Sequence, residues 1–194
     1  MNLPNLLSMI RVALVPVFVA VLLFMRNIEI WGYIVPAVIY IITGLTDMLD
    51  GKIARKYNLI TDFGKFIDPL ADKFMVLSSM ISILVWMLLR GEVTMALIFV
   101  WVVLVILLRE LGVTSLRLVV AGKSGIVVAA SMLGKIKTVS QMVGTVVIMV
   151  EPILPFFSEN HILSYFAMVV MTFTTIFSGI DYLKVYFPHI DSNK

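Results

Sequence analysis

The sequence predicts an all-α integral membrane protein with six transmembrane helices and a short N-terminal interfacial helix. Of its 194 residues, 61% are hydrophobic and only 14% are charged, whereas soluble domains have about 45–50% apolar and about 25% charged residues. The apolar segments are long and continuous, which is typical of membrane-spanning helices rather than of the alternating strands of a β-barrel. No internal repeat or linker is evident, so a single domain over residues 1–194 is expected.

The order of the spans follows from the polar breaks between the apolar segments. After an interfacial helix at 2–10, spans are expected at 11–25, 32–56, 74–89, 94–120, 134–150 and 161–187, with a connector at 121–133. The second and third spans have purely apolar runs that are shorter than the ~20 residues needed for a crossing. Both helices must therefore continue through the charged segment between them, which places that segment inside one leaflet.

The lysines and arginines predict the orientation of the chain. Six spans put both termini on one side of the membrane, and all Lys and Arg residues except Arg26 and Arg90 fall on that side. Cationic residues are enriched on the cytoplasmic side of membrane proteins. The termini and the charged segment are therefore expected to face the cytoplasm.

Four aspartates lie in the charged segment between the second and third spans. Asp47 and Asp50 are three residues apart and Asp68 and Asp72 are four apart, so on helices each pair shares a face. Carboxylates inside a membrane are costly, and one or two divalent cations would hold them ionised together. The chain has no cysteine and only two histidines, far apart, so an oxygen-only ligand set favours Mg²⁺ or Mn²⁺.

Residues beside the aspartates predict a ligand that carries phosphate. Gly51 would let a bulky ligand approach the helix backbone closely, and Gly64 would do the same or shape the turn. Arg55 can donate two hydrogen bonds to a phosphate. Two metal ions held by carboxylates would stabilise the entering and leaving oxygens of a phosphoryl displacement.

A second cationic group lies in the later spans. Its members are Arg109, Arg117, Lys135 and Lys137. The N-terminal amides of the fifth span, where two of these lysines lie, also favour anions. The group is expected to hold a second, anionic substrate that carries its own phosphate. Arg109 has the alternative of a structural ion pair with Glu110 or Asp181.

The charged segment resembles the signature of the CDP-alcohol phosphatidyltransferases, D-x-x-D-G-x-x-A-R-x8-G-x3-D-x3-D. The eight matching positions are Asp47, Asp50, Gly51, Ala54, Arg55, Gly64, Asp68 and Asp72. The resemblance implies six transmembrane helices, a homodimer and a reaction at the cytosolic face of the membrane. In that reaction, a hydroxyl of the acceptor attacks the β-phosphorus of a CDP-linked donor and CMP is released.

The resemblance also implies a role for each matching residue. The metal ligands, for Mg²⁺ or Mn²⁺ in a site of two ions, would be Asp47, Asp50, Asp68 and Asp72. Asp72 is further implied to act as the general base on the acceptor hydroxyl. The residues that would hold the CDP donor are Gly51, Ala54, Arg55 and Gly64.

Three stretches outside the signature resemble the members of this family that use CDP-diacylglycerol as donor and sn-glycerol 3-phosphate as acceptor, so the resemblance implies these two substrates. They begin at Leu3, Arg109 and Gly134, and the cationic group would then bind the phosphate of the acceptor. Expected partners are these two substrates, membrane lipids and a second copy of the chain, with no nucleic acid. The expected location is the inner membrane of a bacterial cell.

Two alternatives are left open by the sequence. A related transferase with another acceptor would serve cardiolipin, phosphatidylinositol phosphate or phosphatidylserine synthesis. A divalent-cation transporter would also place carboxylates in a membrane. Such transport sites tend to lie near the midplane, often at broken helices in related halves of the chain, and the neighbouring cations here would repel a passing metal ion.

Overall fold

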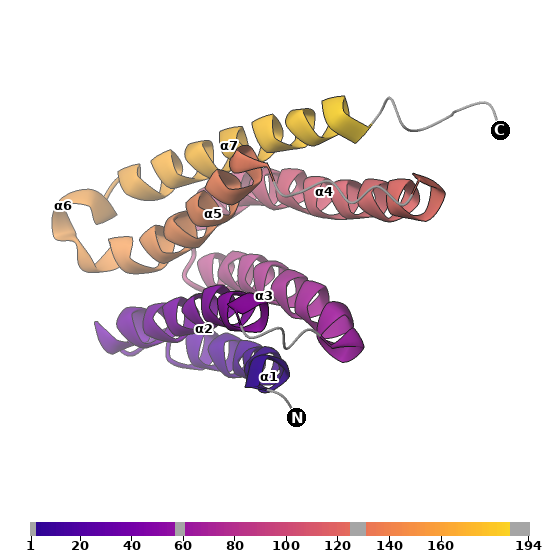
Figure 1. The fold of residues 1–194 in the computed structure, drawn as a ribbon. Helices are drawn as coiled ribbons and strands as arrows, with labels where there is room; N and C mark the ends of the chain where they lie inside the picture. Colours follow the sequence, from indigo (N-terminus) through magenta and orange to yellow (C-terminus); the bar gives the residue numbers. More distant parts are fainter. Residues whose placement is uncertain (1–2, 57–60, 125–130, 187–194) are drawn as a thin grey trace.

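The computed structural model describes residues 3–56, 61–124 and 131–186, and Figure 1 shows their arrangement. The long helices are α1 (Leu3–Phe24), α2 (Trp31–Lys56), α3 (Asp62–Leu89), α4 (Val93–Ser124), α5 (Met132–Val150) and α7 (Ile162–Tyr186). A 3-10 turn, η1 (Glu151–Ile153), and the short helix α6 (Pro155–Ser158) connect α5 to α7. The described residues contain no strand, which confirms the all-α fold class.

The helices have the lengths and compositions that membrane spans require. Of the described helices, α1, α3, α4, α5 and α7 are long and apolar enough to cross a membrane. In α2, the apolar part is shorter, Trp31–Thr46, but the helix continues to Lys56. Helix α3 begins at Asp62, well before its apolar part. The charged segment is thus largely helical, as the two short apolar runs predicted.

The helices form two groups of three, one above the other in Figure 1. Helix α1 packs against both α2 and α3, while α7 packs against both α4 and α5. Contacts of α3 with α4 and of α2 with α5 join the two groups. The buried side chains form a core that both groups share, including Phe18, Tyr40, Trp86, Phe99 and Met171.

The N-terminal segment differs from the expected interfacial helix. Residues Leu3–Phe24 form one helix, so no break separates residues 2–10 from the first span. Asn5, Ser8 and Arg11 follow each other at intervals of three and are 7%, 0% and 0% exposed. These polar side chains lie on the face that packs into the protein, which removes the reason for the segment to lie flat at the membrane surface.

The connector between the fourth and fifth spans is also shorter than expected. Helix α4 extends to Ser124 and α5 begins at Met132, so both helices take residues from the segment at 121–133. Residues 125–130 and the polar tail from 187 onward lie outside the described part of the chain.

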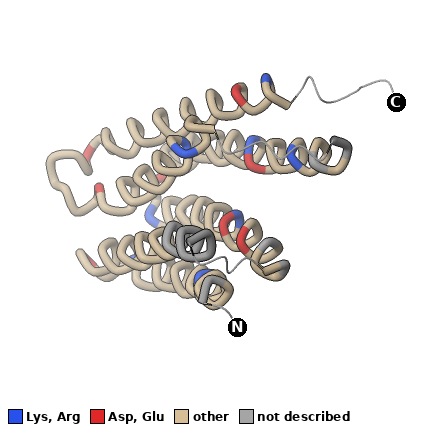
Figure 2. Tube along the Cα trace, viewed as in Figure 1, with Lys and Arg blue, Asp and Glu red and all other residues tan. Residues whose placement is uncertain are grey.

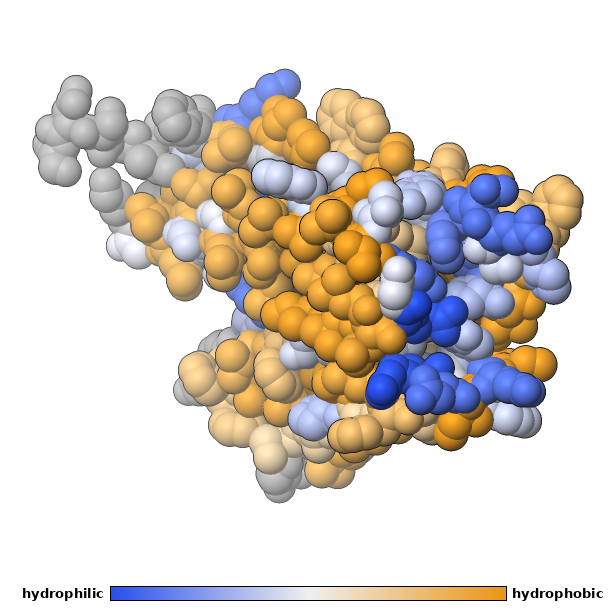
Figure 3. Space-filling view, turned by 180° about the vertical axis from the view of Figure 1, so that it is seen from behind, coloured by the Kyte–Doolittle hydropathy of each residue, from blue (hydrophilic) through white to orange (hydrophobic). Residues whose placement is uncertain are grey.

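The two ends of the helical bundle differ in their charged residues. The start of α1 and the end of α7 lie at one end, called the terminus end below (Figure 1). Most charged residues of α3, α4 and α7 lie in the halves of these helices nearest that end (Figure 2). Seen from behind, apolar side chains cover the middle of the molecule and hydrophilic ones gather at the opposite end (Figure 3). This pattern suits a protein surrounded by lipid at mid-height.

Candidate active site

The four signature aspartates lie towards the terminus end of α2 and α3. Asp50 is six residues before the end of α2, and Asp68 is six residues after the start of α3. At ~1.5 Å per residue, each lies about 9 Å from the end of its helix. The helical backbone therefore places the two pairs at similar depth along the bundle.

Several of the predicted donor and metal residues fall outside the described side chains. They are Asp47, Asp50, Ala54 and Arg55, for which only the helical backbone of α2 is described. The same holds for Gly51, which has no side chain. Their roles stay predictions, supported by their positions on one helix at the terminus end.

Asp68 and Asp72 lie one turn apart on α3. The carboxylate of Asp68 is on an exposed residue, and its Oδ1 accepts a hydrogen bond of 2.6 Å from the hydroxyl of Ser8. Asp72 is half-buried, and its charge acts on the ammonium group of Lys137. Helix α3 thus presents one exposed carboxylate and, one turn further along the helix, a half-buried one.

The donor atoms at this site suit a hard divalent cation. Asp68 and Asp72 offer carboxylate oxygens, the ligands that Mg²⁺ and Mn²⁺ prefer. Among the described side chains, no three acidic residues or histidines gather into a metal-binding group. The other two predicted ligands are Asp47 and Asp50 on α2, whose side chains lie outside the described part of the structure. The described pair fits half of the predicted ligand set.

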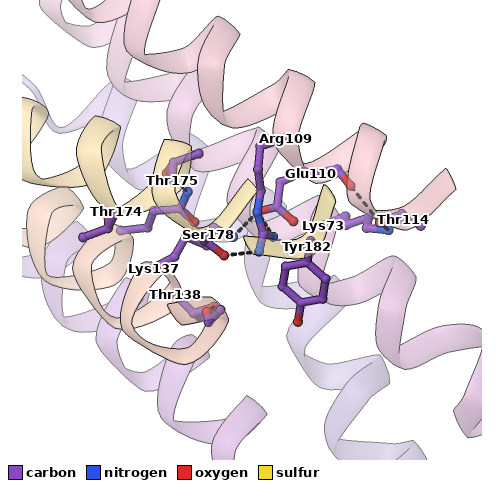
Figure 4. Close-up of polar contacts among 12 residues, drawn as sticks. Lys73, Arg109, Glu110, Thr114, Lys137, Thr138, Thr174, Thr175, Ser178 and Tyr182 are labelled. Carbon is purple, nitrogen blue, oxygen red and sulfur yellow. Dashed lines mark hydrogen bonds and ion pairs between the residues drawn. The ribbon is translucent and has the colours of Figure 1, made fainter. Parts of the chain in front are cut away.

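A buried ion cluster, called the Glu110 cluster, joins helices α4, α5 and α7. It consists of Arg109, Glu110, Lys137, Ser178 and Tyr182 (Figure 4). Lys137 Nζ donates to Glu110 Oε1, and Arg109 Nη1 lies 3.4 Å from the same oxygen. Arg109 Nη2 donates to Ser178 Oγ at 2.6 Å, and the guanidinium lies 5.2 Å from the centre of the Tyr182 ring.

The Glu110 cluster retains capacity for an anion. Among the members of the cluster, one carboxylate faces two largely buried cations. Arg109 Nε is buried and has no hydrogen-bond partner among the described residues. An unsatisfied buried donor is costly, roughly 1–3 kcal/mol, and a phosphate oxygen would satisfy it. The arrangement is suited to a small phosphate-bearing molecule.

The structure brings together two of the four cations that were predicted to bind the acceptor. Arg109 and Lys137 meet at Glu110, whereas Arg117 and Lys135 are exposed. The predicted alternative, an ion pair between Arg109 and Glu110, is present as well. The two interpretations are compatible because the cluster holds one more cation than carboxylate.

A direct contact links the aspartate helix to the Glu110 cluster. Lys73, the residue after Asp72, donates a hydrogen bond of 2.5 Å from Nζ to Thr114 Oγ1. Thr114 lies one turn after Glu110 on α4, and its hydroxyl donates to the Glu110 carbonyl. Helices α3 and α4 are therefore joined at the residue next to Asp72, one turn from Glu110.

An apolar cavity of about 280 Å³ opens between α2 and α5. Its lining residues are Tyr40, Ile41 and Leu45 on α2 and Met142, Val143, Val146 and Val147 on α5. Leu45 precedes Asp47 by two residues, so the cavity borders the aspartate end of α2. An apolar space beside a polar site is suited to the hydrocarbon part of a lipid.

Sequence reasoning missed several residues of the site. Glu110 was weighed only as a partner of Arg109, and Ser178 and Tyr182 gave no signal because their contacts with α4 are distant in sequence. Ser8 did leave a signal, since polar residues at every third position of an apolar helix indicate a buried polar face. Gly64 faces this polar side of α1. A β-carbon at position 64 would lie 2.9 Å from Asn5 Oδ1.

Comparison with known proteins decides the family. A sequence model of the family described as CDP-alcohol phosphatidyltransferase matches residues 1–179. The chain belongs to this family. Its signature aspartates and the neighbouring cation cluster are thus found on the fold of a CDP-alcohol phosphatidyltransferase.

Individual relatives are similar over most of their length. A protein of Bacillus subtilis named CDP-diacylglycerol–glycerol-3-phosphate 3-phosphatidyltransferase is 40% identical over 94% of both chains. One of the same name from Pseudomonas fluorescens is 30% identical over all of this chain and 94% of its own. A probable phosphatidylglycerophosphate synthase of Mycobacterium tuberculosis is 34% identical over 94% of this chain and 80% of its own.

Proposed function

We propose that this CDP-alcohol phosphatidyltransferase transfers a phosphatidyl group from CDP-diacylglycerol to sn-glycerol 3-phosphate, producing phosphatidylglycerophosphate and CMP. The observation that carries the proposal is the 40% identity, over 94% of both chains, to a relative named for this reaction. The Glu110 cluster supports the choice of acceptor, because its two cations and the spare donor Arg109 Nε suit a phosphate. The cavity between α2 and α5 suits the donor's hydrocarbon.

In this proposal, the residues of α3, α4 and α5 bind and orient the acceptor. Arg109 and Lys137 hold its phosphate, and Asp72 accepts the proton of the attacking hydroxyl. Holding the hydroxyl beside its base and in line with the donor converts a bimolecular encounter into an intramolecular step, which contributes much of the rate. Gly51, Ala54 and Arg55 on α2 are proposed to hold the CDP group.

We further propose that Asp47, Asp50, Asp68 and Asp72 hold two Mg²⁺ or Mn²⁺ ions. When bound, such ions stabilise the negative charge that develops on the phosphoryl oxygens. The carboxylates of this chain would fix the positions of the ions. The protein is proposed to be a homodimer in the bacterial inner membrane, with its termini and site on the cytoplasmic side.

The test is CMP release by the purified protein in detergent with CDP-diacylglycerol and Mg²⁺ or Mn²⁺. Separate reactions contain glycerol 3-phosphate, inositol 1-phosphate, serine or phosphatidylglycerol. We expect release with glycerol 3-phosphate alone and none in EDTA. Release with a different acceptor would keep the family chemistry and discard the acceptor assignment, while metal flux in liposomes without CMP release would support the transporter.

The variant Asp72→Asn tests the proposed base. It keeps the shape of the side chain but cannot take up the proton at neutral pH, so we expect the transfer rate to fall by at least about 100-fold. Folding, measured by thermal unfolding, and binding of the CDP-lipid are expected to be largely kept. Turnover close to that of the unaltered protein would show that another group accepts the proton.

A further inference from the structure

The N-terminal half of α1 meets α3 at two levels, one helical turn apart. At the first level, the Gly64 amide donates to Thr61 Oγ1 at 3.0 Å, and the Thr61 hydroxyl donates to Asn5 Oδ1, also at 3.0 Å. At the second level, the Ser8 hydroxyl donates to Asp68 Oδ1 at 2.6 Å. Two contacts at matching intervals fix both the rotation and the height of α3 relative to α1.

The first level depends on the absence of a side chain at position 64. A β-carbon there would lie 2.9 Å from Asn5 Oδ1 and 3.2 Å from Thr61 Oγ1. Real β-carbons essentially never approach a non-bonded atom of another part of the chain below 3.0 Å. Asn5 is itself buried and hydrogen-bonded, so it can withdraw only by losing its bond with Thr61. The space beside Gly64 is therefore filled by α1.

The second level acts on a carboxylate of the signature. A hydrogen bond from another side chain fixes the orientation of a ligating carboxylate, and removal of such a partner typically weakens metal affinity or activity 10–100-fold. Ser8 is fully buried, so its hydroxyl is held by packing rather than by solvent. The bond is made to Oδ1 of Asp68.

We propose that Ser8 is a positioning residue that orients Asp68 for metal binding, and that position 64 is glycine so that α1 can dock on α3. Asn5 and Thr61 set the start of α3 at the right height, and Ser8 then sets the carboxylate. The proposal rests on the proposed use of Asp68 as a metal ligand. It assigns a function to a helix that lies outside the signature.

The first experiment measures Mn²⁺ binding directly, without turnover. The full-length protein in detergent is titrated with Mn²⁺, and free Mn²⁺ is followed by electron paramagnetic resonance. We expect Ser8→Ala to weaken binding about 10–100-fold and to raise the Mn²⁺ concentration for half-maximal rate in parallel. Ser8→Thr, which keeps the hydroxyl, should recover most of the affinity.

The matched control is Ser82→Ala. Ser82 is a buried serine of α3 whose hydroxyl donates to the backbone of its own helix, so its loss should leave Mn²⁺ affinity unchanged. Equal affinity of Ser8→Ala and the unaltered protein would overturn the role of Ser8 and leave the proposed function intact. Absence of Mn²⁺ binding by the unaltered protein would overturn both.

The second experiment tests position 64 and remains informative if Ser8→Ala does not fold. Gly64→Ala is expected to lower both the thermal midpoint and the rate, because the new methyl group meets Asn5. The double variant Asn5→Ala/Gly64→Ala lacks the oxygen that the new methyl group would meet. It should recover part of the thermal midpoint and part of the rate, with Asn5→Ala alone as the reference. No recovery, together with a selective loss of donor binding in Gly64→Ala, would show that the donor fills this space and would overturn the docking role.

Discussion

Lys135 and Lys137 are two residues apart on α5 and lie in different surroundings. Lys135 is exposed, whereas Lys137 is 4% exposed and donates to Glu110. A charge-assisted hydrogen bond to a phosphate contributes about 1.5–3 kcal/mol. We therefore expect Lys137→Gln to raise the KM for glycerol 3-phosphate by roughly 10- to 100-fold, with little change in the KM for CDP-diacylglycerol.

Lys135→Gln is the comparison for that measurement, because it removes the same charge from the same helix. A smaller rise in the acceptor KM is expected there, since an exposed contact is screened by water. Equal rises in both variants would show that the exposed lysine shares the phosphate. Equal effects of Lys137→Gln on both substrates would contradict a role specific to the acceptor.

At the level of residues, spacing predicted the helical placement of Asp68 and Asp72 but not the contacts around them. Asp68 and Asp72 were placed on one helical face by their spacing alone, and the structure has them there. The meeting of Lys137 with Glu110 joins residues 27 positions apart on two helices. Local periodicity carries no information about such contacts, because they depend on how separate helices pack.

Glu151 ties the end of α5 to the beginning of α7. It is 1% exposed, and its two carboxylate oxygens accept hydrogen bonds from the amides of Leu163 at 2.7 Å and Ser164 at 3.0 Å. The first amides of a helix have no partner within the helix, and a negative charge at that end is favourable. A carboxylate from a neighbouring helix fills the role of a cap.

We expect Glu151→Gln to lower the free energy of unfolding by about 1–3 kcal/mol. The glutamine side chain has no negative charge and only one acceptor oxygen, where the glutamate has two. The measurement is equilibrium unfolding in detergent. Glu159→Gln is the control, since Glu159 is exposed in the same connection. The KM for the acceptor is expected to be unchanged in both variants. Equal stability of the two variants would contradict the role of Glu151 as a cap of α7.

At the level of elements, helix lengths were predictable and helix faces were only partly so. The apolar run of α2 was too short to cross a membrane, which correctly predicted that the helix continues through the aspartates to Lys56. The break expected near residue 10 is absent because Asn5 and Ser8 contact α3. Polar residues near a helix start indicate either a membrane surface or a buried partner, and the sequence did not distinguish the two.

The orientation of the whole molecule can be tested cleanly because the chain contains no cysteine. Asn27 is exposed at the end opposite the termini. Gly122 is exposed at the terminus end, with nothing within 4 Å of an added β-carbon. Single cysteines at these positions should therefore be tolerated.

We expect a membrane-impermeant maleimide to label Asn27→Cys in cells with an intact inner membrane, and Gly122→Cys only after the cells are opened. The physical reason is the excess of lysine and arginine at the terminus end, which favours the cytoplasmic side. The reverse labelling pattern would place the active site on the outer face and would contradict the proposed orientation.

The apolar part of α2, Trp31–Thr46, has a consequence for the lipid around it. At ~1.5 Å per residue it spans about 24 Å, less than the ~30 Å thickness of a typical hydrocarbon core. A bilayer accommodates a short hydrophobic segment by becoming thinner around it. Where the bilayer is thinner, its headgroup layer lies closer to the aspartates of α2. The proposed donor, CDP-diacylglycerol, could then diffuse laterally into the site while its diphosphate stays in the hydrated headgroup layer.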